Sequence, residues 1–201
     1  MNFVLAVIIV AVIIVVIAVS VVPRSSDSTG VTTEPEYRRA GRYGERLATN
    51  LIREVLNEDD RLFTNVNIEC DGMSAELDNV IVNSCGVFII ETKNYKGRLY
   101  GNEDDYKWIK FKDDGYGNTF EKEVKNPIKQ VKRQTYILAK YLKQNGQRVW
   151  IDGYAFLVNG NSPVESCRML SNSEDIDRAI HTIGKKPLTK QQVDSVAKLL
   201  Q

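Results

Sequence analysis

Cysteine and histidine are scarce in this sequence, and their scarcity excludes several kinds of site. The 201 residues include three cysteines, Cys70, Cys85 and Cys167, and a single histidine, His181. The cysteines form no Cys-x-x-Cys pair and no Cys/His cluster, so neither a zinc site nor a thiol-redox motif is predicted. An odd, widely spaced set also argues against a disulfide scaffold. The lone histidine excludes His-rich metal centres and nucleophiles paired with histidine.

An excess of charge of either sign is also missing. The chain has 27 basic and 26 acidic residues, which gives a formal net charge of +1 at pH 7. The overall charge therefore does not indicate a nucleic-acid binder, and any such surface has to be a local patch.

The first part of the chain lacks charge altogether. Residues Phe3–Val22 are uncharged and almost wholly aliphatic, and as a helix rising about 1.5 Å per residue they would span the roughly 30 Å hydrocarbon core of a bilayer. The first positive charges, beginning with Arg24, follow this run. The positive-inside rule therefore predicts a single-pass membrane protein whose C-terminal domain is cytoplasmic. The alternative is a signal peptide cleaved after Ala18-Val19-Ser20, which would release a secreted protein, but the long run without a preceding Lys or Arg favours an uncleaved anchor.

The rest of the sequence predicts an α/β domain. We assign residues 1–23 to the anchor, 24–36, rich in Ser, Thr, Gly and Pro, to a flexible linker, and 37–201 to the domain. Helices are predicted at 37–56 and 126–144, and strands at 63–69, 75–82, 87–93, 98–101, 106–111 and 150–158. The first helix is expected to bury one stripe, formed by Ala40, Gly44, Leu47, Leu51 and Val55. Two short helices finish the chain, the last with a capping box at Thr189 and Gln192. This order predicts a mixed central sheet flanked by helices.

Three charged residues stand in or beside the most apolar strands. Asp78 lies in the 75–82 strand, and Glu91 and Lys93 end the 87–93 strand. Residues two apart in a strand face the same side, so Glu91 and Lys93 point together, and Asp78 can converge on them if the two strands pair. Two neighbouring carboxylates repel each other, and a cation that prefers oxygen ligands, such as Mg²⁺, relieves the repulsion.

Such a cation can polarise a phosphodiester oxygen and lower the pKa of a bound water. Lys93 can then orient or deprotonate that water, or stabilise the charge that builds on the phosphate. The structural alternative is a simple ion pair at the strand end, either Glu91–Lys93 or Asp78–Lys93.

The spacing from Asp78 to Glu91-Thr92-Lys93 resembles the PD-(D/E)XK nuclease signature. More specifically, the segments "GRYGERLATNLI", "ELDNVIVNSCGVFIIETKNYKGRLYG" and "NPIKQ", in this order, resemble the nuclease-related (NERD) domain over about residues 37–141. The resemblance implies a restriction-endonuclease-like core, with Asp78 and Glu91 as metal ligands and the backbone carbonyl of Thr92 as a third oxygen. The implied cofactor is Mg²⁺, with Mn²⁺ as an alternative.

The same resemblance implies roles for further residues. Lys93 would be the catalytic lysine, Glu45 an accessory acid from the first helix, and Gln130 a polar helix residue that reaches the site. Many members carry His after the aspartate, where this chain has Asn79. An asparagine hydrogen-bonds but does not titrate near neutral pH, so it cannot shuttle a proton there.

A second stripe on the 126–144 helix is predicted to hold nucleic acid. It consists of Lys129, Arg133, Tyr136, Lys140 and Lys143. Basic side chains suit phosphates and the tyrosine suits one stacked base, although an ordinary solvated face has the same pattern. The sequence thus predicts a membrane-anchored, Mg²⁺-dependent nuclease acting on DNA. The alternative is a non-catalytic, membrane-anchored module that binds nucleic acid or a protein partner through a nuclease-like core.

Overall fold

The computed structural model describes residues 34–113, 115–183 and 187–201. The anchor predicted at residues 1–23, and residues 24–33 of the linker, lie outside the described residues. None of the helices in the described ranges combines the length and the apolarity that crossing a bilayer requires.

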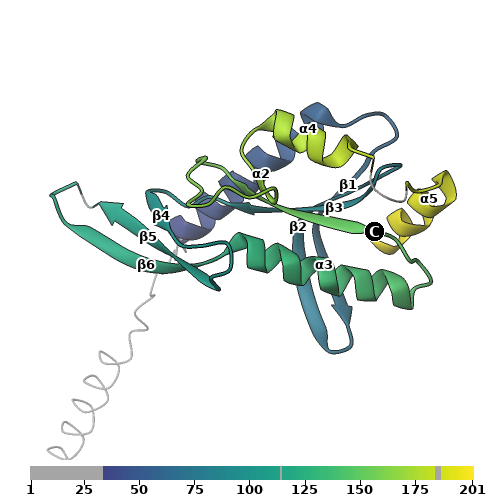
Figure 1. Cartoon of the computed structure of the whole chain (residues 1–201), viewed down its shortest axis with the longest axis horizontal. Coiled ribbons are helices and arrows are strands. Elements are labelled where there is room, and N and C mark those ends of the chain that lie inside the picture. Colours follow the sequence, from purple (N-terminus) through teal and green to yellow (C-terminus); the bar gives the residue numbers. More distant parts are fainter. Residues whose placement is uncertain (1–33, 114, 184–186) are drawn as a thin grey trace, which may run out of the picture. The chain divides into compact units, whose positions relative to one another are not determined.

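A mixed five-stranded sheet forms the centre of the fold (Figure 1). Its strands are, in spatial order, β1 (Arg61–Cys70), β2 (Met73–Asn83), β3 (Gly86–Lys93), β7 (Ile151–Leu157) and β8 (Met169–Leu170). The first three pair antiparallel, and β7 and β8 continue the sheet in parallel with β3. The α/β class and the mixed sheet expected from the sequence are confirmed.

Helices cover both faces of this sheet because β2 and β3 are apolar on both sides. Val80, Val82, Val87 and Ile89 pack with α3 (Pro127–Gln144) and α5 (Lys190–Leu199). The alternate residues Ile81, Phe88 and Ile90 pack with α2 (Glu36–Val55) and α4 (Ser173–His181). Period-2 alternation in a strand sends neighbouring side chains to opposite faces, so a run that is apolar throughout needs a layer of helices on each side.

The helix ends follow the signals in the sequence, while the buried stripe of α2 differs from the expected one. The Asn126 side chain accepts a hydrogen bond from the backbone N–H of Ile128, with Pro127 at the first helical position. The capping box of Thr189 with Gln192 is present. On α2, however, the fully buried residues are Gly44, Ala48 and Ile52. Of the expected stripe, Gly44 is buried, whereas Ala40, Leu47, Leu51 and Val55 are only partly buried, and Ala48 and Ile52 face the core in their place.

A separate three-stranded antiparallel sheet extends beyond the first turn of α3 (Figure 1). It consists of β4 (Arg98–Tyr100), β5 (Lys107–Asp113) and β6 (Thr119–Lys125). Its base is anchored by Leu99 and the fully buried Trp108, which pack against Ile128, Ala155 and Leu157. The sequence did not predict β6, whose residues are nearly all exposed.

Candidate active site

The candidate site lies where β2 and β3 part. Asn79 and Ile90 form the last paired position of these strands. Beyond it, the carboxylate of Asp78 takes the place of a strand partner, because its Oδ2 accepts a hydrogen bond from the backbone N–H of Thr92 at 2.8 Å. Opposite Asp78, the residue on β1 is Asn65, whose positive φ of 54° interrupts the ladder between β1 and β2. The ends of the two apolar strands therefore bring Asp78 beside Glu91 and Lys93.

Glu91 is fully buried and accepts hydrogen bonds from three side chains. Its Oε1 accepts from Nζ of Lys93 at 2.5 Å and from Nε2 of Gln130 at 2.5 Å, and its Oε2 accepts from Nε2 of Gln134 at 2.6 Å. The strand-end ion pair considered as the structural alternative is thus present. A carboxylate offers about four lone-pair positions, so these contacts leave one position, on Oε2.

Asp78 is much less well compensated than Glu91. Burial, followed by the charge of Glu91, raises its pKa to about 7, and Glu45 adds a further repulsive charge. The Thr92 N–H and the charge of Lys93 act in the opposite direction without cancelling these effects. Asp78 therefore changes charge near neutral pH, a property typical of functional sites.

Lys93 is held as an ammonium group by the same carboxylates. Burial acts to lower its pKa, but the charge and hydrogen bond of Glu91 and the charge of Asp78 outweigh it, so the pKa is raised. A protonated lysine cannot take a proton from water. Of the roles considered for Lys93, stabilising negative charge or orienting a ligand fits this environment.

The donor set at this point could hold a hard divalent cation. It comprises the carboxylates of Asp78 and Glu91 and the backbone carbonyl of Thr92, all oxygens, which hard divalent cations prefer. Oδ2 of Asp78 accepts the hydrogen bond from the Thr92 N–H, so Oδ1 is the oxygen of Asp78 that is left to bind a cation. On Glu91, Oε2 has one lone-pair position left beside the hydrogen bond from Gln134. Within the described part of the chain, no group of three or more His, Cys, Asp or Glu side chains could hold a metal.

Two helices bring the remaining predicted residues to this point. Glu45 comes from α2, and its charge acts on Asp78, with which it lines a cavity of about 440 Å³. Gln130, in the first turn of α3, reaches Glu91. The structure therefore brings together all five residues named as catalytic from the sequence.

Gln134 was missed in the sequence. It lies one helical turn after Gln130, is buried, and bridges Glu91 to the backbone carbonyl of Glu76, its Nε2 lying 2.8 Å from that oxygen. The signal was an amide in a stripe that is otherwise apolar, next to Val131 and Leu138. The side-chain oxygens of both glutamines are buried and have no hydrogen-bond partner among the described residues.

Asn79, which stands where many relatives carry histidine, is turned toward α2. It is fully buried, and its Oδ1 accepts a hydrogen bond from the Thr49 hydroxyl at 2.8 Å. It thus links β2 to α2 beside the site.

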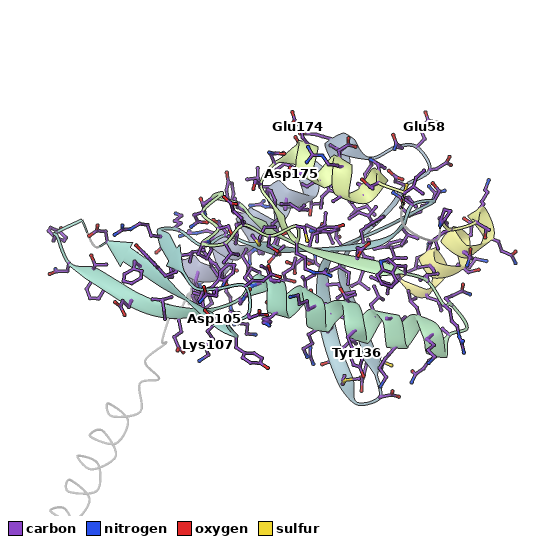
Figure 2. The ribbon with its side chains drawn as sticks, in the orientation of Figure 1. Glu58, Asp105, Lys107, Tyr136, Glu174 and Asp175 are labelled. Carbon is purple, nitrogen blue, oxygen red and sulfur yellow. The ribbon has the colours of Figure 1, made fainter. Side chains whose placement is uncertain are left out.

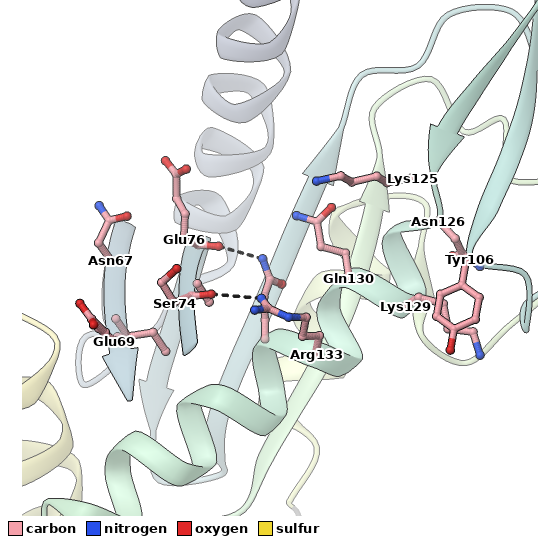
Figure 3. Close-up of a pocket in the computed structure, with 13 residues that line it drawn as sticks. Asn67, Glu69, Ser74, Glu76, Tyr106, Lys125, Asn126, Lys129, Gln130 and Arg133 are labelled. Atoms are coloured by element: carbon pink, nitrogen blue, oxygen red, sulfur yellow. Dashed lines mark hydrogen bonds between the residues drawn. The ribbon is translucent and has the colours of Figure 1, made fainter. Parts of the chain in front are cut away.

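A cavity of about 960 Å³ opens between the β1–β2 hairpin and α3 (Figure 3). Gln130 lies on its wall, so the cavity borders the candidate site. Arg133 closes part of it by donating from Nη1 to the backbone carbonyl of Ser74 at 3.1 Å (Figure 3).

The basic stripe of α3 is largely engaged by the chain itself. Lys129 pairs with Asp104 at 2.8 Å, and Lys140 pairs with Asp71 at 2.7 Å. The ammonium of Lys140 also lies 5.6 Å from the ring centre of Tyr136. Tyr136 itself is on the outer surface of α3 (Figure 2), and Lys143 is exposed. Most of the cations expected to bind phosphates thus already have a partner within the protein. Lys129 binds the loop before β5, and Arg133 and Lys140 bind the β1–β2 hairpin.

Comparison with known proteins identifies the family. A model described as "NERD: Nuclease-related domain" matches residues 40–158, more than half of the chain. An "Uncharacterized protein" of Bacillus anthracis is 30% identical over 69 residues, which cover 34% of this chain and 32% of that relative. The match thus spans about a third of the length of the relative. No solved structure gives a significant match. The chain belongs to the nuclease-related domain family.

Proposed function

We propose that this nuclease-related domain protein is a metal-dependent nuclease that hydrolyses phosphodiester bonds in DNA. The observation that carries the proposal is the meeting of Asp78, Glu91 and Lys93 where two strands part, with one carboxyl group whose pKa is about 7. The family match supports a nuclease. A mixed sheet flanked by helices, with the acidic residues at a strand end, also agrees with a restriction-endonuclease-like core.

In this proposal each residue of the site has a separate role. Asp78, Glu91 and the Thr92 carbonyl would hold Mg²⁺ or Mn²⁺, which when bound supplies a Lewis acid for a phosphodiester oxygen and for water. The Lys93 ammonium stabilises negative charge that develops on the phosphate. The amides of Gln130 and Gln134 fix the orientation of Glu91.

Glu45 completes the proposed machinery from α2. Its position near Asp78 suits an accessory acid that accepts a hydrogen bond from the attacking water. We also infer that residues 3–22 hold the protein to a membrane with the domain 37–201 in the cytoplasm, on the basis of their unbroken apolar sequence.

A second candidate function is a non-catalytic, membrane-anchored binding module. The observation that favours it is that the Glu91 carboxylate accepts hydrogen bonds from three side chains. A carboxylate with this many donors can be present solely to stabilise the fold.

The two functions are separated by a cleavage assay. The purified full chain in detergent is incubated with supercoiled plasmid in the presence of Mg²⁺, Mn²⁺ or EDTA. We expect nicking or linearisation that requires the metal and is lost in Asp78→Asn and in Lys93→Met. Glu121→Gln, which neutralises an exposed acidic residue of β6, is the matched control and should retain activity. If the wild-type protein leaves plasmid intact with either metal, the nuclease proposal is wrong and the binding module remains.

A further inference from the structure

One face of the β4–β5–β6 sheet changes from apolar to basic along its length. Cross-strand pairing places on this face Trp108, Lys110, Lys112, Phe120, Lys122 and Val124. Trp108 is fully buried and Val124 packs against the same cluster, so this face is turned toward the domain. Further out on the same face, Lys110 stands directly opposite Lys122, with Lys112 next to them.

The acidic residues of β5 and β6 are all on the opposite face. Glu123 pairs across the sheet with Ile109, and Glu121 with Phe111. Glu123 also holds Lys107 in an ion pair at 2.5 Å on that outer face. A sheet that only needs to be solvated mixes the two signs, because like charges directly opposite each other are destabilising. The separation therefore needs another explanation.

The three lysines of the inner face lie close enough for their charges to repel one another. No carboxylate among the described residues forms an ion pair with Lys110, Lys112 or Lys122. Burial lowers the pKa of Lys110, and the charges of Lys122 and Lys112 lower it further. A partner that brings several negative charges would remove this repulsion.

These lysines border the candidate active site. Lys110, Lys112 and Lys122, together with Lys96, line a cavity of about 380 Å³ whose other walls include Lys93, Thr92 and Glu45. The cavity thus runs from the residues proposed to act on a phosphate to these four lysines, and Glu36 of α2 is the one further acidic residue on its wall besides Glu45. We name the surface formed by Lys96, Lys110, Lys112 and Lys122 the lysine groove.

We propose that the lysine groove binds the phosphodiester backbone of DNA next to the bond that is cut, and that it is the main docking surface in place of the stripe on α3. The inference rests on the proposed function, since the groove opens on the same site. Charge complementarity supports it: the groove cations are without acidic partners among the described residues, whereas Lys129 and Lys140 of α3 already hold Asp104 and Asp71. A flat anionic membrane is the less suitable partner, because the groove is recessed against the site.

The test measures DNA binding without cleavage. Anisotropy of a fluorescein-labelled DNA duplex is titrated with the full chain in detergent and EDTA over a range of salt concentrations. Each lost phosphate contact lowers the slope of log K against log [salt] by about 0.9, so Lys110→Gln/Lys122→Gln should lower it by roughly 1.8 and weaken binding on the order of fifty-fold at 0.1 M salt. The matched control, Lys129→Gln/Lys140→Gln, removes the same charge from α3 and should leave the slope unchanged.

Three results of the anisotropy measurement would contradict the proposal that the lysine groove binds DNA. They are equal slopes for wild type and the groove variant, a loss confined to the α3 variant, and no salt-dependent binding of DNA by wild type. A fourth is a retained DNA slope in the groove variant together with loss of a thermal stabilisation that phosphatidylglycerol, added to the detergent micelles, gives to the wild type, which would assign the groove to lipid headgroups. The nuclease proposal is tested separately, by plasmid cleavage in Mg²⁺. The anisotropy measurement in EDTA does not depend on cleavage, so the two proposals can fail independently.

Discussion

Replacement of Asp78 by asparagine should make the domain more stable at alkaline pH. Asparagine has nearly the same size as aspartate, and its Oδ1 can still accept the hydrogen bond from the Thr92 N–H. The substitution removes only the negative charge, which is buried and faces the charge of Glu91. An ordinary surface aspartate would change stability little when neutralised, so the effect isolates the repulsion inside the site.

The expected magnitude follows from the shifted pKa. The pKa of Asp78 rises from 3.8 to about 7 on folding, chiefly through burial and then through Glu91. Between these values the folded protein keeps a proton that the unfolded chain has released, so the free energy of unfolding falls as the pH rises through this window. At about 1.4 kcal/mol for each pKa unit, the wild-type protein loses up to about 4 kcal/mol by pH 8. Asp78→Asn avoids that loss and should match wild type only near pH 4.

The assay is urea unfolding of the full chain in detergent from pH 4 to pH 8, followed by tryptophan fluorescence, which changes when the buried Trp108 becomes exposed, whereas Trp150 is already exposed in the fold. Asp113→Asn, in an exposed part of β5, is the control and should follow wild type at every pH. In EDTA at pH 8, Asp78→Asn should unfold at a higher urea concentration than wild type, and Mg²⁺ should stabilise wild type alone. A variant that is less stable than wild type at pH 8 would refute the reasoning, because it would mean that Asp78 is a favourable structural charge.

Three further predictions test the surroundings of the site. Gly44→Ala should lower the free energy of unfolding by about 1–3 kcal/mol, because its new Cβ would lie 2.8 Å from a side chain of the loop after β3. Gly41→Ala is the control and should be neutral or slightly stabilising, because its Cβ would meet nothing closer than 4.0 Å. Thermal melts of the two variants show whether α2 packs as described. Glu91→Ala should lower the free energy of unfolding by about 3 kcal/mol in urea, because it leaves a partly buried ammonium and two amides without their acceptor. No loss of stability would contradict the hydrogen-bond network. Deletion of residues 3–22 should move the protein from the carbonate-resistant membrane fraction to the supernatant, and recovery of the unaltered chain in the supernatant would exclude the anchor.

The sheet and the helices could be predicted because each rests on a local signal. The runs that became β2, β3 and β7 each contain an unbroken apolar segment, at residues 80–82, 87–90 and 154–157. Asn126-Pro127 and Thr189 mark helix starts with residues of known preference. By contrast, β6 could not be predicted. Its segment "TFEKEVK" alternates in charge and is almost entirely exposed, so its strand conformation comes from pairing with β5, which no local pattern records.

The candidate site divides in the same way. The acidic residues and Lys93 were visible because charge is out of place in apolar strands. Gln134 was marked only as an amide in an apolar stripe, and its contact with Glu91 depends on the distance between α3 and β3, which only the packed structure sets. The lysine groove was also hidden. Lys122 lies between two glutamates in the sequence and Lys110 lies twelve residues earlier, and only the register of β5 with β6 brings the two lysines together on the face opposite the acidic residues.

Glu91 and Asp78 are equivalent in the sequence, but the structure makes them different kinds of residue. Glu91 is fully buried, yet an ammonium and two amides compensate its charge, so a stable fold alone could account for it. Asp78 receives one backbone N–H and faces further negative charge, and a protein selected for stability alone would carry an amide or an apolar residue there. The incompletely compensated charge of Asp78 is therefore the feature of the site that structural requirements do not explain. In the proposed function a bound cation accounts for it, which is why Asp78, more than the ion pair of Glu91 with Lys93, supports a metal-dependent activity.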